Sequence, residues 1–200
     1  MRPLHRFLAA ISAVPLLVGG LAACSSSGSD SGPGSSSAAS TGSADSTATT
    51  TDAALFPMTL TASNGKVTLA SRPARIVSLS PTATEDLFAV GAGSQVVAVD
   101  KDSDYPASVP KSSLDGITPN AEAILKYQPD LVVASADSNG LVAAMTKVGV
   151  PVLIESAATS LDGAYDQILQ LGTATGHEAT AQATVASMKS QIATSVKQAG

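Results

Sequence analysis

Apolar and polar positions alternate along "MTLTASNGKVTLA", which spans residues 58–70, with an interruption at Asn64-Gly65. Two alternating runs joined by Asn-Gly are typical of a β-hairpin. Further along, short apolar runs alternate with longer segments whose apolar residues recur at helical spacing. The sequence therefore predicts a hairpin, with order beginning near Phe56, followed by a series of strand–helix units.

Four short apolar runs are typical of buried strands, and they cover residues 75–80, 95–100, 129–135 and 150–155. Helical segments follow each of them. Such alternation predicts an α/β fold, Rossmann-like, in which a mainly parallel sheet carries helices on both faces. Ligands of such sheets bind beyond the carboxyl ends of the strands.

Two helix starts can be placed from local signals. Pro81 ends the first buried strand, and Thr82 with Glu85 three residues later resembles a capping box. Thr118 followed by Pro119 predicts the start of the helix in "NAEAILKYQ". A long final helix is expected over residues 177–200, and because its inner face lacks a cover we expect the chain to continue past Gly200.

The N-terminus has the pattern of a secretory signal over residues 1–23. Arg2 and Arg6 precede an apolar run, which ends in Leu21-Ala22-Ala23-Cys24. These four residues resemble the lipobox of bacterial lipoproteins, in which the cysteine is acylated and becomes the first mature residue. The alternative is a free cysteine in a membrane helix, although residues 7–23 are near the lower length limit for spanning.

Residues 24–54 are almost entirely Ser, Thr, Gly and Ala, and this composition predicts a disordered tether. Without residues 1–23 the chain has nine basic and sixteen acidic residues, a net charge of −7. This acidic balance, without a basic patch, argues against a nucleic-acid partner. The sequence therefore predicts an acidic domain held at a membrane surface by Cys24.

Several motifs in order, "RPARIVSLSPTATEDLFAVGAGSQVVAVD", "SDYP", "NAEAILKYQPDLVVAS" and "VGVPVLIE", resemble the ABC-importer solute-binding proteins for iron–siderophore complexes or cobalamin. The resemblance covers residues 66–197. It implies an N-terminal ligand-binding lobe over residues 55–176, a joining helix over 177–200 and a second lobe that this sequence lacks. It also implies a monomer on the extracytoplasmic face of the cell membrane that needs no cofactor.

The resemblance assigns roles to individual residues. The turn Pro81, Thr82, Ala83 and Thr84 matches the loop that faces ligand from a helix N-terminus, where free N–H groups suit anionic oxygen atoms. Glu122 matches the acidic residue that pairs with arginines on the permease. The other positions implied to face ligand are Asp102, Tyr105, Gly116, Ser135 and Asp137, although Tyr105 could instead pack under its own turn.

The ligand class follows less directly from these positions. Cobalamin-binding members offer aromatic side chains here, whereas this sequence has Asp102, Gly116 and Ser135 and lacks tryptophan. Siderophore-binding members often use arginine, and the only arginines after the signal sequence are Arg72 and Arg75. We expect an iron–siderophore or similar large chelate, with a corrinoid or haem as alternatives.

Other classes of function have weaker support. Catalysis would need a nucleophile elbow or facing carboxylates, whereas no G-x-S-x-G is present and adjacent Glu85 and Asp86 point apart on a helix. A bare metal site would need clustered ligands, and the two histidines, His5 and His177, are far apart in sequence. A single-lobed surface interaction lipoprotein remains the third alternative, favoured if the natural chain ends at Gly200.

Overall fold

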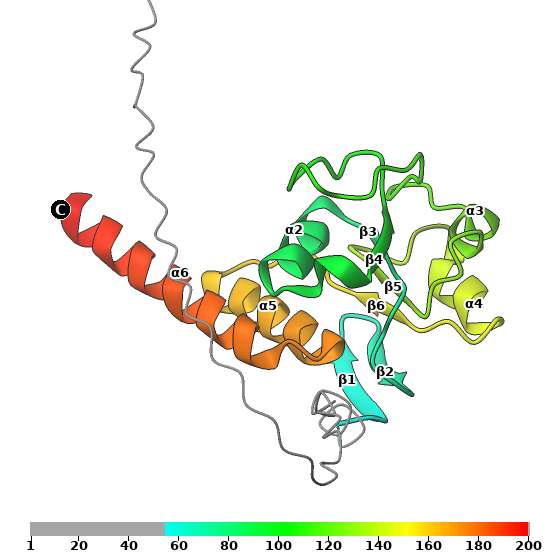
Figure 1. Cartoon of the computed structure of the whole chain (residues 1–200), viewed down its shortest axis with the longest axis horizontal. Coiled ribbons are helices and arrows are strands. Elements are labelled where there is room, and N and C mark those ends of the chain that lie inside the picture. Colours follow the sequence, from blue (N-terminus) through cyan, green and yellow to red (C-terminus); the bar gives the residue numbers. More distant parts are fainter. Residues whose placement is uncertain (1–54, 200) are drawn as a thin grey trace, which may run out of the picture. The chain divides into compact units, whose positions relative to one another are not determined.

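A computed structural model of the 200-residue chain describes residues 55–199 (Figure 1). The signal sequence predicted over residues 1–23, the lipidation site at Cys24 and the tether over 24–54 lie outside the described residues, as does Gly200.

The main sheet has four parallel strands, β3 (Ile76–Leu79), β4 (Val96–Val99), β5 (Leu131–Ala134) and β6 (Val152–Ile154). Their spatial order is β4-β3-β5-β6, which places the first strand of this sheet in its interior. Every residue of β3, β5 and β6 is buried, as expected for strands that helices cover on both faces. The four buried strands and their parallel arrangement were predicted from sequence, and the structure confirms both.

Helices cover the two faces of this sheet (Figure 1). One face packs against α2 (Pro81–Ala89), α5 (Leu161–Thr175) and α6 (Glu178–Ala199), through a core that includes Ile76, Leu87 and Leu171. The opposite face packs against α3 (Ala121–Leu125) and α4 (Leu141–Thr146). Two short 3₁₀ helices, η1 (Ala92–Gln95) and η2 (Ser138–Gly140), complete the connections.

The predicted starts of two helices are each wrong by two residues. Ser80 is the N-cap of α2, and its Oγ accepts a hydrogen bond from the Ala83 N–H at 3.4 Å, because Pro81 already occupies the first helical position. Thr82 therefore does not form a capping box. Helix α3 is capped by Asn120, since the backbone of Thr118 belongs to the preceding turn.

The predicted hairpin is also present, as β1 (Met58–Ala62) and β2 (Gly65–Leu69). Its turn covers the outer edge of β6. The Asn64 side chain donates to the Val152 carbonyl at 2.9 Å and accepts from the Ile154 N–H at 3.2 Å, as a neighbouring strand would. Asn64 thus protects part of an edge that would otherwise present unpaired backbone groups.

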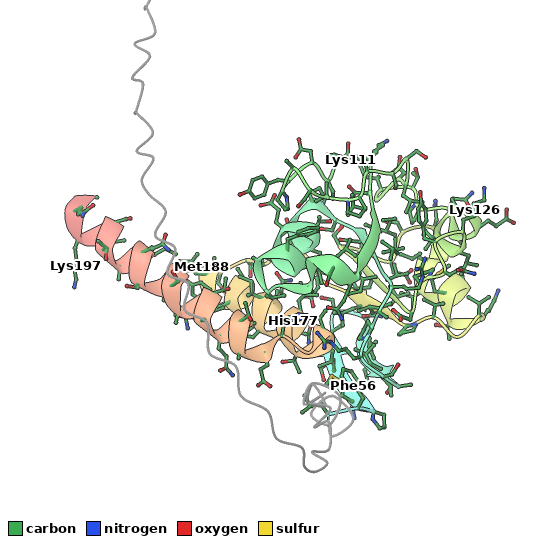
Figure 2. All side chains as sticks on the ribbon, in the orientation of Figure 1. Phe56, Lys111, Lys126, His177, Met188 and Lys197 are labelled. Atoms are coloured by element: carbon green, nitrogen blue, oxygen red, sulfur yellow. The ribbon has the colours of Figure 1, made fainter. Side chains whose placement is uncertain are left out.

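Only residues 176 and 177 separate α5 from α6, and the two helices pack closely, with Gly172 of α5 facing Ala181 of α6. Only Ala181 and Val185 of α6 are buried, whereas Val196 near its end is 66% exposed. The second half of α6 thus contacts little of the described structure (Figures 1 and 2). The long final helix itself was predicted from sequence, and the structure confirms it. None of the described helices is both long and apolar enough to cross a membrane.

Candidate ligand-binding site

Because all four strands of the main sheet are parallel, the segments that follow them meet at one edge, here called the carboxyl edge. Most residues predicted to face ligand lie there with exposed side chains: Pro81, Thr82, Asp102, Tyr105, Ser135 and Asp137. Tyr105 is 65% exposed, so its ring does not pack under its own turn. The Asp137 carboxylate accepts a hydrogen bond from the Val142 N–H at 2.9 Å and so holds the loop after β5 to the start of α4.

Two residues of the predicted ligand loop are buried instead. Ala83 is 3% exposed and Thr84 is fully buried. The Thr84 hydroxyl bonds to the hydroxyls of Ser78 and Ser103 inside the protein. The turn therefore offers the side chains of Pro81 and Thr82 to solvent, and the Thr84 side chain has an internal role.

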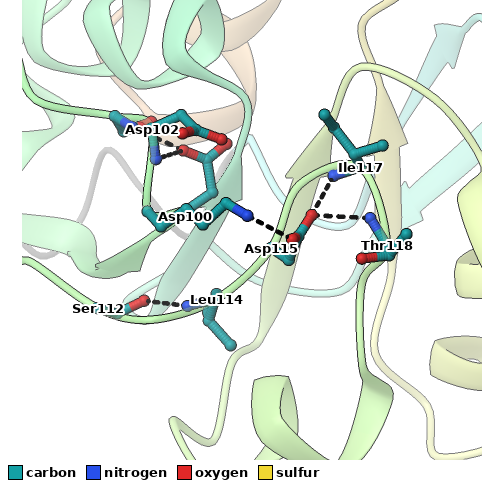
Figure 3. Close-up of polar contacts among 9 residues, drawn as sticks. Asp100, Asp102, Ser112, Leu114, Asp115, Ile117 and Thr118 are labelled. Atoms are coloured by element: carbon teal, nitrogen blue, oxygen red, sulfur yellow. Dashed lines mark hydrogen bonds and ion pairs between the residues drawn. The ribbon is translucent and has the colours of Figure 1, made fainter.

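The loop after β4 is fixed by a buried carboxylate. Asp100 is only 2% exposed, and its Oδ1 accepts hydrogen bonds from the N–H groups of Asp102, at 3.0 Å, and Ser103, at 2.7 Å (Figure 3). Lys101 N–H also donates to the Leu114 carbonyl at 2.8 Å. The backbone that carries Asp102 and Tyr105 is thus held by hydrogen bonds within the protein.

A second turn, over residues 112–118, lies beside this loop (Figure 3). The Asp115 carboxylate pairs with Lys101 at 2.7 Å and accepts hydrogen bonds from the N–H groups of Ile117 and Thr118, both at 2.9 Å. These contacts, the hydrogen bond from Lys101 first, hold the pKa of Asp115 well below its usual range, and the same bond raises the pKa of Lys101. The turn presents Ile117, which is 76% exposed and was not predicted from sequence.

Gly116 sits in the same turn but brings no side chain to a ligand. A Cβ built on Gly116 would lie 2.5 Å from the Leu79 carbonyl oxygen and 2.7 Å from Asp100 Oδ2. This glycine therefore allows the turn to approach the end of β3 closely, which is a structural reason for its presence.

A cavity of about 450 Å³ opens between the carboxyl edge, α2 and α5. Three residues of its lining, Thr82, Ala83 and Ser135, were predicted to face ligand, whereas Asp102, Tyr105 and Gly116 do not line it. Among the other lining residues, which were not predicted to face ligand, are two carboxyl groups and an amide, those of Asp86, Glu155 and Gln167. Glu155 directly follows a buried parallel strand, and an acidic residue at that place was a signal that could have been used.

The two carboxyl groups of this cavity both have raised pKa values. Burial, and then the charge of Glu85, raise the pKa of Asp86 to about 6. Burial, and then the charge of Asp86, raise the pKa of Glu155 to about 7. Among the described residues Glu155 Oε1 has no hydrogen-bond partner. This cavity is therefore suited to hydrogen-bond donors or a positive group, and poorly suited to an anion.

The arginines considered for anionic ligands lie at the other end of the sheet, just before β3. The Arg72 Nε donates to the Thr175 carbonyl at 2.8 Å. The Arg75 guanidinium donates to the Tyr127 carbonyl at 2.6 Å and the Gln128 carbonyl at 3.0 Å. Both guanidinium groups thus hold backbone carbonyls in place and do not reach the carboxyl edge.

Glu122 is exposed in the first turn of α3, apart from the cavity.

His177 lies between α5 and α6, where its Nε2 is 3.3 Å from an Arg72 nitrogen. No group of three His, Cys, Asp or Glu side chains within residues 55–199 is placed to hold a metal ion.

Comparison with known proteins identifies the family. Residues 76–199 match the family described as periplasmic binding protein. An uncharacterized ABC transporter substrate-binding lipoprotein of Bacillus subtilis is 38% identical over 144 residues, which are 69% of this chain and 46% of that protein. A cobalamin-binding protein of Halobacterium salinarum is 35% identical over 147 residues, which are 70% of this chain and 40% of that protein.

Solved structures agree with these relatives. A possible iron-binding periplasmic solute-binding protein from Staphylococcus epidermidis is 30% identical with a TM-score of 0.60, over 64% of this chain and 52% of that one. A periplasmic heme-binding protein from Roseiflexus is 31% identical with a TM-score of 0.54, over 60% of this chain and 48% of that one. The chain spans about half the length of the curated relatives it matches. It belongs to the periplasmic binding protein family.

Proposed function

We propose that this chain is part of the substrate-binding component of an ABC importer, which captures an iron–siderophore-type or related large chelate and delivers it to a membrane permease. One observation supports this most directly: exposed side chains of three separate loops gather at the carboxyl edge beside a cavity of about 450 Å³. A rigid, partly apolar edge of this kind suits a large ligand that is held by surface complementarity.

Two details bear on the choice of chelate. Tyr105 and Ile117 are exposed on firmly held loops and can pack against the flat or apolar part of a ligand. The arginines are engaged elsewhere and the cavity contains Asp86 and Glu155, which disfavours a strongly anionic chelate. Since the relative from Halobacterium salinarum is named a cobalamin-binding protein, a corrinoid is the second candidate, and haem is a third because the similar Roseiflexus structure is that of a heme-binding protein.

In this proposal residues 55–176 form the N-terminal ligand-binding lobe and α6 is the start of the helix that joins it to a second lobe. The exposed second half of α6 supports this role, because a joining helix would gain its remaining contacts from that lobe. In this proposal ligand capture needs a small hinge motion between the lobes and no chemical step, so no cofactor is required. The binding component is proposed to act as a monomer.

Membrane attachment is the next part of the proposal. Residues 1–23 serve as a lipoprotein signal peptide, Cys24 is acylated, and the serine-rich segment over 24–54 tethers the lobe at the extracytoplasmic face of the cell membrane. Changing Cys24→Ser should move the protein from the membrane fraction to the soluble extracytoplasmic fraction. An unchanged membrane fraction would contradict lipidation at Cys24.

Glu122 is proposed to dock on the permease, because it is exposed and lies on α3, away from the cavity.

The proposed function as a whole is tested by deleting the gene and measuring uptake of a labelled ferric siderophore, cobalamin and haem. Loss of uptake of one of these, restored by the gene, is the expected result. Full uptake of all three without the gene would contradict the proposal.

A further inference from the structure

A chain of buried hydroxyl groups runs beneath the carboxyl edge. Thr84 Oγ1 lies 3.0 Å from Ser103 Oγ and donates to Ser78 Oγ at 2.8 Å, and Ser78 Oγ donates to the Ser80 carbonyl at 3.3 Å. Because the Thr84 proton is directed to Ser78, the hydrogen bond with Ser103 is donated by Ser103. Each of these three hydroxyl groups thus donates one hydrogen bond, and the series ends at the carbonyl of Ser80, the residue that caps α2.

The three hydroxyl groups come from separate parts of the fold. Ser78 belongs to β3, Thr84 to α2, and Ser103 to the loop that carries Asp102 and Tyr105. Ser78 and Thr84 are fully buried and Ser103 is 1% exposed. Water therefore does not reach these hydroxyl groups, and removing one of them leaves its partner without a hydrogen bond, which costs free energy. Among the hydrogen bonds of residues 55–199, the one between Thr84 and Ser103 is the only one that joins residues 101–105 to α2.

We propose that Thr84 is a positioning residue for the ligand site: its hydroxyl holds the loop of residues 100–105 against the base of α2, and so fixes Tyr105 and Asp102 relative to Pro81 and Thr82. Its effect on ligand affinity rests on the proposed function. Its effect on the loop does not, because that effect follows from the buried hydrogen bonds alone.

Asp100 explains why this one contact matters. Its carboxylate fixes the loop internally, through the N–H groups of Asp102 and Ser103. Two further hydrogen bonds join the loop to neighbouring segments. The Lys101 N–H donates to the Leu114 carbonyl at 2.8 Å, and the Lys111 amine donates to the Ser103 carbonyl at 3.4 Å. The loop is therefore a preformed unit. Its start is held on β3, because the Asp100 N–H donates to the Ser78 carbonyl at 2.9 Å, and the hydroxyl of Thr84 supplies its hydrogen bond to α2.

The test is amide hydrogen exchange in the folded 200-residue chain, comparing position 103 with the amides of β3. Thr84→Val keeps the shape of the side chain but removes the hydroxyl, and it should speed exchange at Ser103 about tenfold relative to β3. Thr84→Ser restores the hydroxyl and should return this ratio to near its original value.

Thr175→Val is the matched control. Thr175 is also fully buried and its hydroxyl bonds to the Leu171 carbonyl at 2.7 Å, at the other end of the sheet. This variant should speed exchange at Ser103 and in β3 alike, without changing their ratio. Should Thr84→Val not fold, Ser103→Ala removes the other partner and should raise the exchange ratio in the same way. Equal ratios in the Thr84→Val and Thr175→Val proteins would overturn the positioning role.

A second measurement separates this role from the proposed function, using cyanocobalamin, haemin and a ferric hydroxamate as probes on the natural protein. For a probe that binds, Thr84→Val should weaken affinity about tenfold and Thr84→Ser should restore it. If no probe binds but the exchange ratio responds as stated, the proposed function is rejected and the positioning role stands. If a probe binds and the exchange ratio does not respond, the reverse conclusion holds.

Discussion

Gly116 lies directly against the backbone carbonyl of Leu79, the last residue of β3: a Cβ on this glycine would stand 2.5 Å from that oxygen. The same Cβ would lie 2.7 Å from Asp100 Oδ2, which belongs to a buried carboxylate. Neither atom can move away easily, because the first is main chain and the second belongs to a carboxylate whose other oxygen, Oδ1, accepts two backbone hydrogen bonds. The close approach of two loops at the carboxyl edge thus requires a residue without a side chain.

Gly116→Ala should therefore destabilise the protein by about 1–3 kcal/mol, since the added methyl group must displace backbone or a buried carboxylate. Gly163→Ala is the matched control. It lies in the first turn of α5, its Cβ would meet atoms at 3.4 Å and 3.6 Å, and it should be neutral or stabilising by up to about 1 kcal/mol. Denaturant unfolding of both variants checks the prediction, and equal stability of the two would contradict it.

Stability should fall as the pH rises from about 4 to about 7. The pKa values of Asp86 and Glu155 are raised from ordinary values of 3.8 and 4.5 to about 6 and about 7, so the folded state binds protons more tightly in this window. The free energy of unfolding then decreases with pH until both groups have ionised. Asp86→Asn or Glu155→Gln should flatten this slope.

At pH 8 each of these two variants should be more stable than the unmodified protein, because it no longer carries a partly buried negative charge. The gain should be on the order of 1 kcal/mol, since both carboxyl groups remain partly open to water. Glu85→Gln removes only the smaller cause of the Asp86 shift and should flatten the slope less. Thermal unfolding between pH 4 and pH 8 is the measurement. A slope that survives in the double variant Asp86→Asn/Glu155→Gln would show that other groups cause it.

Glu122→Ala should lower uptake of the ligand by cells at least tenfold and leave the Kd for the ligand unchanged, because a charge pair at a protein interface is lost while the cavity is intact. Asp162→Ala is the control, since Asp162 is likewise exposed in the first turn of a helix, α5. Both variants lose a favourable interaction with a helix N-terminus and should be destabilised alike. Equal effects on uptake and on Kd would remove the docking role.

Much of the fold could be predicted from local patterns. The four buried strands are continuous apolar runs, and the hairpin is marked by Asn64-Gly65, so their positions follow from residues close in sequence. The role of Asn64 at the edge of β6 could not be predicted, because it depends on contacts 88 and 90 residues away. Helix starts were misplaced where two capping residues competed, as Ser80 and Thr82 did.

The site was predictable to a lesser degree. Parallel strands bring their carboxyl ends together, and this rule alone placed Asp102, Tyr105 and Ser135 at one edge. Burial is a property of the packed molecule, so the sequence did not reveal that Thr84 points inward. The interaction of Asp86 with Glu155 likewise joins α2 to the end of β6 and has no signature in either segment.

Binding of a large chelate is best measured by calorimetric titration of the natural protein with a ferric hydroxamate, cyanocobalamin and haemin. We expect saturable binding of one probe at one site per chain, with a rise in melting temperature that depends on the concentration of the probe. The Tyr105→Ala variant should bind that probe more weakly than the unmodified protein does. If none of the three probes binds or shifts the melting temperature, the protein does not have the proposed function.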